Sequence, residues 1–172
     1  MMHPLALFSY CPKCGSVRFV ENNFKSKQCE NCGFVYYFNS SAATAIFITN
    51  SKGQLLTVRR AKDPAKGTLD LPGGFVDLHE TAEEAIMREV QEETGLIIKK
   101  PVYLFSLPNI YTYSGFDVHT LDMFYACTVE DLTGLHPDDD AADLYFLDKE
   151  EIQTEEFGLN SIRKAIKIWL TK

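Results

Sequence analysis

The chain has 172 residues, 45% of them hydrophobic, which is enough for the core of one ordinary domain with a small appendage. Its 17 Lys and Arg residues against 24 Asp and Glu residues give a formal net charge of −7, which argues against sustained attraction to a nucleic acid. No stretch approaches the length needed to span a bilayer, and nothing is typical of a secretory signal, so the sequence predicts a cytoplasmic protein.

The first feature along the chain is a pair of Cys-x-x-Cys motifs, formed by Cys11 with Cys14 and by Cys29 with Cys32. Each motif is followed by a glycine, which permits a tight turn around sulfur. Four thiolates can close a tetrahedral Zn²⁺ site, and this spacing is typical of a zinc ribbon. Disulfides or a redox-active motif are the alternatives, but a cytosolic compartment keeps thiols reduced.

We expect this zinc to be structural, because four thiolates leave no open coordination position. A polar step at 39–41 precedes the next apolar run, so the sequence predicts a zinc ribbon at residues 1–38 and a second domain at residues 39–172. Zinc ribbons also bind nucleic acid, but between the first and last cysteine four basic residues only slightly outnumber two acidic ones. A nucleic-acid partner is therefore not expected.

Apolar runs predict the strands of the second domain. They are expected at 43–48, 54–60, 97–106, 121–129 and 144–147, with a glycine loop within 69–76. An amphipathic helix closes the chain, with an apolar side formed by Ile162, Ala165, Ile166, Trp169 and Leu170. Strands interspersed with helices predict an α/β or α+β class.

A central helix is expected from about Thr81 to about Thr94. Thr81 and Glu84 form a capping box, in which the Thr81 hydroxyl accepts from the Glu84 backbone N–H while the Glu84 carboxylate reaches back. Gly95 can take the left-handed conformation that closes a helix. Both ends of this helix are thus marked in the sequence.

Three glutamates share one face of this helix. Glu89, Glu92 and Glu93 lie at positions i, i+3 and i+4, where like charges repel unless a cation lies among them. The preceding loop contains Gly73 and Gly74, and paired glycines let a backbone present its carbonyls or amides to a ligand. The combination predicts a site for hard metal ions and phosphate, with a solvated acidic helix face as the alternative.

From Gly74 to Leu96 the sequence resembles the box of the Nudix hydrolase family. That box reads Gly, five residues, Glu, seven residues, then Arg-Glu-aliphatic-x-Glu-Glu-x-Gly-aliphatic, and every fixed position is matched. The resemblance implies a mixed-sheet α/β/α sandwich and a homodimer. It also implies hydrolysis of a nucleoside diphosphate linked to another group, by attack of water on phosphorus with Mg²⁺ or Mn²⁺ bound.

The resemblance further implies roles for individual residues. Glu89 and Glu93 would hold metal directly, and Glu92 would hold metal or help to deprotonate water. The Gly73 carbonyl would be a further ligand. The residues that would orient this cluster are Arg88, which lies four residues before Glu92, and Glu80.

Many members of the family recruit a further acidic residue from a later loop. In this chain the loop at 136–143, ahead of the expected strand at 144–147, contains several aspartates. Asp140 is our choice as base or metal ligand, with an ordinary polar surface loop as the alternative.

A zinc ribbon ahead of such a domain resembles the arrangement of the NADH pyrophosphatase group. The signature of that group is Ser-Gln-Pro-Trp-Pro-Phe-Pro-x-Ser, and residues 106–114 keep its two serines, its first proline and an aromatic residue but lack the Trp and two prolines. The resemblance implies a dinucleotide such as NADH or NAD, or an ADP-ribose-like molecule, as substrate. Capped RNA 5′ ends are a more distant alternative.

Four residues are candidates for substrate binding. Tyr111, Tyr113 and Phe116 could stack on a base or nicotinamide, or instead pack under their loop or against a second subunit. One of the neighbouring arginines Arg59 and Arg60 could meet a phosphate, with Arg59 as our choice, or be an ordinary surface cation.

A noncatalytic nucleotide-sensing or nucleic-acid-binding regulator built on the same domain is the rival class, although it would not need the glutamates. An enzyme that removes damaged nucleoside triphosphates is a further alternative.

Overall fold

The structure, a computed structural model, describes residues 3–171. Contacts divide the chain into two compact units, one up to Ser40 and one from Ser41 onward. Within the described residues, no helix is long and apolar enough to cross a membrane.

The first unit is a small antiparallel sheet in the order β1-β2-β3. Its strands are β1 (Phe19–Asn23), β2 (Ser26–Cys29) and β3 (Val35–Tyr37). Its buried cluster consists of Phe19, Cys11 and Cys29, with two further residues packed against it. Because so little apolar surface is buried, a unit of this size needs another source of stability, such as a bound metal.

The second unit is built on a six-stranded mixed sheet in the order β6-β5-β4-β8-β7, with β9 paired to β5. Strands β4 and β8 run parallel and the other pairs are antiparallel. The strands are β4 (Ser41–Asn50), β5 (Leu55–Arg60), β6 (Leu69–Asp70), β7 (Val102–Tyr113), β8 (Phe116–Val129) and β9 (Ala141–Leu147). The helices are α1 (Ala82–Thr94) and α2 (Asn160–Leu170), with 3-10 turns η1 (Lys149–Glu151) and η2 (Thr154–Glu156).

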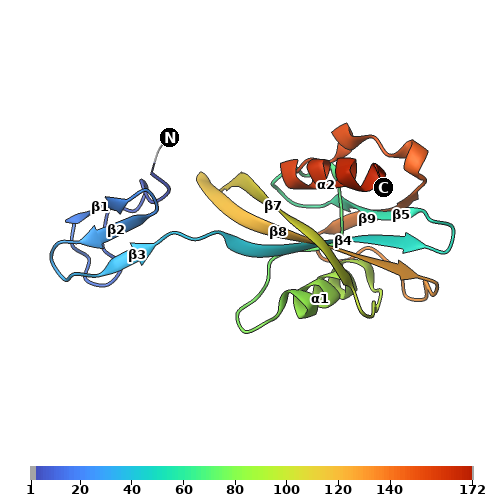
Figure 1. The fold of residues 1–172 in the computed structure, drawn as a ribbon, viewed down its shortest axis with the longest axis horizontal. Coiled ribbons are helices and arrows are strands. Elements are labelled where there is room, and N and C mark those ends of the chain that lie inside the picture. Colours follow the sequence, from blue (N-terminus) through green and yellow to red (C-terminus); the bar gives the residue numbers. More distant parts are fainter. Residues whose placement is uncertain (1–2, 172) are drawn as a thin grey trace. The chain divides into compact units, whose positions relative to one another are not determined.

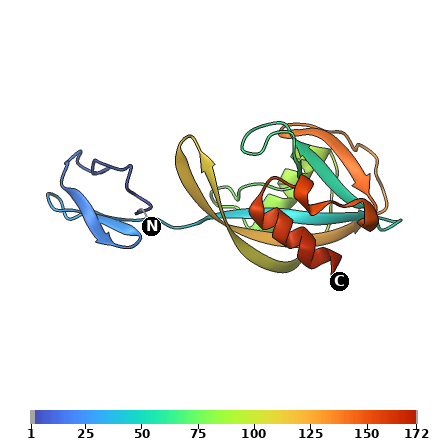
Figure 2. The same cartoon turned by 90° about the horizontal axis from the view of Figure 1, so that it is seen from above.

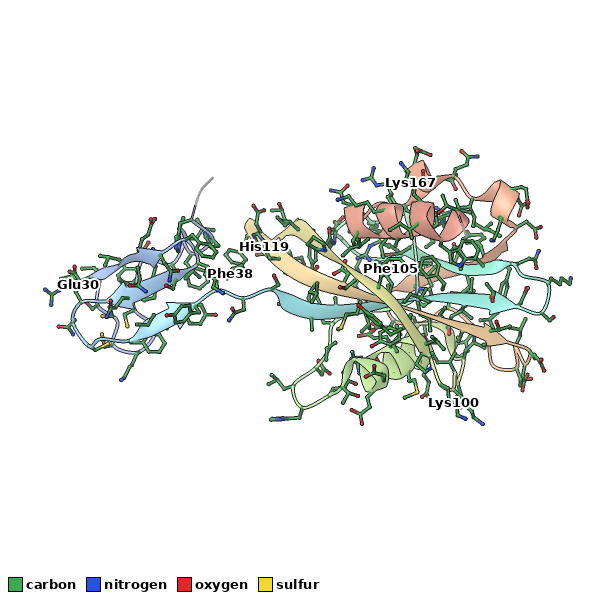
Figure 3. The ribbon with its side chains drawn as sticks, viewed as in Figure 1. Glu30, Phe38, Lys100, Phe105, His119 and Lys167 are labelled. Carbon is green, nitrogen blue, oxygen red and sulfur yellow. The ribbon has the colours of Figure 1, made fainter. Side chains whose placement is uncertain are left out.

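The two α-helices cover opposite faces of this sheet (Figures 1 and 2). Alternating side chains of β4 divide the core into two layers: Ile46 packs with Ile86 and Val90 of α1, whereas Phe47 packs with residues of α2. Trp169 of α2 stacks on Phe47 with ring centroids 5.6 Å apart. Figure 3 shows Lys167 on the outward side of α2 and Phe105 on the sheet beneath that helix. The α/β/α sandwich with a mixed sheet is confirmed.

Helix α1 has the predicted ends. The Thr81 hydroxyl accepts from the Glu84 N–H at 3.2 Å, and Glu84 Oε2 accepts from the Thr81 N–H at 2.8 Å. Gly95 closes the helix with a φ of 70°. Local hydrogen bonds that the sequence itself encodes therefore determine where this helix begins and ends.

The region around β7 differs from the expectation. The strand expected at 97–106 begins only at Val102 and runs on to Tyr113, since Lys100 has a positive φ of 52° and Pro101 has no N–H to donate to a neighbouring strand. Tyr111, Tyr113 and Phe116 were expected around a loop. Residues 114 and 115, both with positive φ, instead form a two-residue turn between β7 and β8.

Candidate active site

Arg88 lies at the centre of the carboxylates of α1 and the segment before it. Its guanidinium donates to both oxygens of Glu80, at 2.9 Å from Nε and 3.0 Å from Nη2. Nη1 donates to Glu89 Oε1 and to Glu92 Oε2, each at 2.9 Å, which confirms the expected pairing of Arg88 with Glu92. Nη2 also donates to the Phe75 carbonyl oxygen at 3.0 Å. One planar guanidinium thus holds three carboxylates and ties the helix to the glycine loop.

Both glycines of this loop lie in close contact with neighbouring groups. Gly73 has a φ of 146°, and a Cβ there would collide with the Thr44 carbonyl oxygen. A Cβ on Gly74 would lie 2.5 Å from the carboxylate carbon of Glu89. The loop therefore fits tightly between β4 and the carboxylates of α1.

The carbonyl groups of the loop alternate in their hydrogen bonding. The oxygens of Pro72 and Gly74 each accept from an N–H of β4, at 3.0 Å and 2.8 Å. No group in residues 3–171 donates to the Gly73 oxygen between them, so this carbonyl is available as a ligand. The Gly73 N–H donates to Glu93 Oε2 at 3.0 Å and so fixes the innermost carboxylate beside that carbonyl.

Burial shapes the electrostatics of the glutamates. Glu93 is only 7% exposed, and burial raises its pKa well above the ordinary value, although the Gly73 N–H acts in the opposite direction. Burial also raises the pKa of Glu89, which Arg88 partly offsets. Hydrogen bonds from Arg88 lower the pKa of Glu80. A cation bound beside Glu89 and Glu93 would favour their ionised forms and remove this unfavourable burial of charge.

The acidic loop before β9 is tied to the end of α1, because the Asp138 N–H donates to the Glu93 carbonyl oxygen at 3.1 Å. Asp139 and Asp140 line the same cavity as Glu93. Lys62 forms ion pairs with both aspartates, at 3.2 Å to Asp139 Oδ1. The structure therefore brings Asp140 and the box glutamates to one cavity.

This cavity has a volume of about 320 Å³. One part of its lining comes from the glycine loop, α1 and the acidic loop, and includes Gly73, Glu89, Glu92, Glu93 and Asp140. Another part comes from the sheet and includes Arg60, Asp70, Asn109, Tyr111, Thr120 and Asp122. The lining thus combines a carboxylate cluster with a wall of mixed polar and aromatic side chains, as in a small-molecule site.

Of the four candidate substrate-binding residues, only Tyr111 is part of the described cavity lining. Its ring centroid lies 6.3 Å from that of Phe75. Tyr113 and Phe116 pair with each other beside the β7–β8 turn. Arg59 lies with its guanidinium carbon 5.1 Å from the centre of the Tyr145 ring and donates to a loop carbonyl oxygen.

Of the two arginines, Arg60 lines the described cavity, whereas Arg59, our choice, lies outside that lining. The register of β5 against β9 shifts between these two arginines, so a pattern of strict alternation could not decide which one faces the site. Arg60 Nη1 donates to Asp70 Oδ2 at 2.6 Å, and Asp70 is 5% exposed. Burial raises the pKa of Asp70, and Arg60 acts against that shift.

The sequence reasoning also missed Asn109, Thr120 and Asp122, which are buried at 6%, 2% and 7% exposure. One signal was available in the sequence. Thr120 and Asp122 lie on the same face of a strand as Phe124, which belongs to the core, so the alternation places two polar side chains on an inward-facing surface. Asn109 pairs with Thr120 across β7 and β8, a relation that only the register shows.

The four cysteines of the first unit form a compact cluster. Their sulfur atoms all lie within 4.8 Å of one another, with 3.8 Å between Cys11 and Cys32 and 3.7 Å between Cys14 and Cys29. A tetrahedron of Zn–S bonds of about 2.3 Å has edges of about 3.8 Å, so the cluster fits zinc. In the described residues no other set of three or more such ligands is as compact, and the glutamates around Arg88 form a more open group.

Comparisons with known proteins agree with this architecture. A family model described as NUDIX domain matches residues 39–169. A protein of Methanocaldococcus jannaschii named ADP-ribose pyrophosphatase is 34% identical over 126 residues, which cover 71% of this chain and 70% of that protein. A crystal structure of a NUDIX hydrolase from Nitrosomonas europaea superposes with a TM-score of 0.71 at 20% identity, covering 95% of this chain and 90% of that one.

A second group of relatives is longer. A Vibrio parahaemolyticus protein named NAD-capped RNA hydrolase NudC is 29% identical over 106 residues, or 62% of this chain. The match spans 40% of that relative's length.

Proposed function

The chain belongs to the Nudix family, and we propose that it is a metal-dependent pyrophosphohydrolase that cleaves a nucleoside diphosphate linked to another group. The observation that carries this proposal is the grouping of Glu89, Glu92, Glu93 and the unpaired Gly73 carbonyl along one cavity. A noncatalytic regulator would have no need for this set.

The donor set suits Mg²⁺ or Mn²⁺, because it consists of carboxylate and carbonyl oxygens. Glu89, Glu93 and the Gly73 carbonyl would hold the metal, with Glu92 and Asp140 as further ligands. Such ions, when bound, neutralise the diphosphate and lower the pKa of a bound water. Asp140 is paired with Lys62, so this aspartate would exchange the ammonium group for the metal.

The remaining groups orient the site and move a proton. Arg88 holds Glu89 and Glu92 in place, and Glu80 holds Arg88 from the other side. The side chain of Glu92 is 47% exposed, against 16% for Glu89, so Glu92 is the more accessible to water. We assign it the role of accepting the proton as water attacks phosphorus, while the P–O bond of the anhydride breaks and the second phosphate leaves.

The substrate class we propose is ADP-ribose or a dinucleotide such as NAD or NADH. The names of the relatives from M. jannaschii and V. parahaemolyticus support this class. Tyr111, which lines the cavity, would contact the base, nicotinamide or sugar, and Arg60 lies on the sheet side of the cavity wall. Arg59, Tyr113 and Phe116 lie outside the described lining and carry no part of this proposal.

We further propose that the four-cysteine cluster holds a structural Zn²⁺ and that the zinc ribbon and hydrolase domains comprise residues 1–38 and 39–172. The tetrahedral fit of the sulfur distances supports the first of these points. We also propose that the protein is a homodimer and that it is located in the cytoplasm.

The test is a panel of ADP-ribose, NAD, NADH, diadenosine polyphosphates, nucleoside triphosphates and NAD-capped RNA, with Mg²⁺ and separately with Mn²⁺. Wild type is compared with Glu92→Gln and with Glu150→Gln, which alters an exposed glutamate in η1. We expect turnover of one compound class that Glu92→Gln abolishes and Glu150→Gln preserves. No turnover of any compound by folded, zinc-loaded protein would favour the regulator, and turnover that survives Glu92→Gln would refute the assigned proton acceptor.

A further inference from the structure

The sheet face beneath α2 changes character toward the cavity. Phe47 of β4 and Phe124 of β8 fill its middle, and both belong to the core layer under that helix. Two residues earlier along each strand, the same face carries Ala45 and Asp122. Because these side chains are small or polar, part of the cavity extends between the sheet and Leu159 and Ile162 at the start of α2. We call this part of the cavity the alcove.

Asp122 is held rigidly in this alcove. Its two carboxylate oxygens accept from the Thr120 and Ser161 hydroxyls, each at 2.5 Å. Thr120 is 2% exposed and Ser161 is fully buried. Each carboxylate oxygen keeps a second lone pair, so Asp122 presents fixed acceptors to the cavity and no donor.

Asn109 stands across the strand pair from Thr120 and lines the same cavity. The residue is 6% exposed, and no group in residues 3–171 forms a hydrogen bond with its side-chain amide. The amide is not among the fully enclosed polar atoms that lack a partner, so it is open to the cavity and free to bind a ligand there. A ligand that offers both a donor and an acceptor would satisfy it.

We propose that Asn109 and Asp122 hold the base of the substrate, and that this base is adenine or another purine with an exocyclic amino group beside a ring nitrogen. The amide oxygen accepts one N–H of that amino group while the amide NH₂ donates to the ring nitrogen. The second N–H of the amino group donates to Asp122. Tyr111 and Phe75, on the same cavity, offer apolar ring faces to the base.

This inference rests on the proposed function, because the base and the diphosphate of one substrate would occupy the same cavity. It specifies the base for which the enzyme is selective. A base with a carbonyl oxygen in place of the amino group would face the acceptor-only carboxylate of Asp122 with another acceptor. Hypoxanthine is such a base. The alcove should therefore discriminate between adenine and hypoxanthine nucleotides.

The test measures equilibrium binding of AMP, IMP and ribose 5-phosphate to the full zinc-loaded chain, without relying on turnover. We expect AMP to bind at least about 10-fold more tightly than IMP or ribose 5-phosphate. Asn109→Ala should weaken AMP binding by about 10-fold and leave ribose 5-phosphate unchanged. Thr112→Ala, on the same strand but outside the described lining, is the matched control and should change neither.

Thermal unfolding of the ligand-free variants separates a binding role from a packing role. Because no protein group pairs with the Asn109 amide, Asn109→Ala should leave the unfolding temperature nearly unchanged. The isosteric variant Asn109→Asp, which loses the donor, should weaken AMP binding in the same way if the alanine variant does not fold. Equal affinity of wild type for AMP and IMP, or an equal loss of AMP and ribose 5-phosphate affinity in Asn109→Ala, would overturn the proposal.

The outcome is distinguishable from that of the hydrolase proposal. AMP selectivity that depends on Asn109, in a protein without turnover, would support the alcove and refute hydrolysis. Mg²⁺-dependent turnover without base selectivity would support hydrolysis and refute the proposed base site.

Discussion

The two glycines of the loop, although adjacent, should respond in opposite ways to an added methyl group. At Gly73 the new Cβ would meet the Thr44 carbonyl oxygen and the backbone of Ala45, and φ is 146°. Backbone of a central strand cannot withdraw, so we expect Gly73→Ala to lower the free energy of unfolding by about 3 kcal/mol or more. The unfolding temperature should then fall by roughly 6–12 °C.

At Gly74 the three atoms nearest to the new Cβ would all belong to the Glu89 carboxylate, with its carbon 2.5 Å away. A flexible side chain can withdraw, and it needs to move by about 1 Å to reach ordinary van der Waals distance. Gly74→Ala should therefore fold, with a loss of at most about 1 kcal/mol. A ligand displaced by about 1 Å should lower kcat/KM on the order of 100-fold.

The assay pairs thermal unfolding with kcat/KM for ADP-ribose in Mg²⁺. A double-mutant cycle with Glu89→Ala isolates the cause, since Gly74→Ala should cost little further activity once the carboxylate is gone. Full activity in Gly74→Ala, or unfolding as severe as that of Gly73→Ala, would refute the reasoning.

Three further predictions concern Arg88, Glu93 and the four-cysteine cluster. Arg88→Lys keeps the positive charge but loses the guanidinium hydrogen bonds to Glu80, Glu89 and Glu92. In steady-state kinetics, kcat should therefore fall on the order of 10- to 100-fold with little change in KM. The folded-state pKa of Glu93 is raised, so its contribution to stability is present at low pH and is lost as pH rises through that pKa. Denaturant midpoints measured from pH 5 to 8 without added Mg²⁺ should therefore fall less in Glu93→Gln than in wild type. Cys29→Ser should abolish tight zinc binding, measured by metal content, while ADP-ribose turnover per folded chain persists.

Local signals in the sequence were sufficient for α1 and its charged face. The capping box, Gly95 and the spacing of Arg88 and Glu92 act within a few residues, so no tertiary information was needed to predict them. The two Cys-x-x-Cys motifs could be predicted in the same way. In each, the N–H of the following glycine donates to the carbonyl oxygen of the first cysteine, so the turn forms within the motif.

The cavity wall depends on strand register and could not be predicted in the same way. A register shift between Arg59 and Arg60 decides which arginine faces the site. Asn109 and Asp122 line one cavity because β7 pairs with β8 across a two-residue turn, whereas the sequence suggested a loop around Tyr111 and Phe116. Contacts between residues on different strands thus determine the residues that would read the substrate.

Hydrolysis of ADP-ribose in ¹⁸O-labelled water tests the central claim most directly. With Mg²⁺ or Mn²⁺ present, water attacking phosphorus should yield AMP and ribose 5-phosphate with one ¹⁸O on the phosphate of one product, detected by mass spectrometry. Glu92→Gln should abolish the labelled product. Absence of metal-dependent cleavage, or ¹⁸O found on the sugar carbon, would contradict the proposed chemistry.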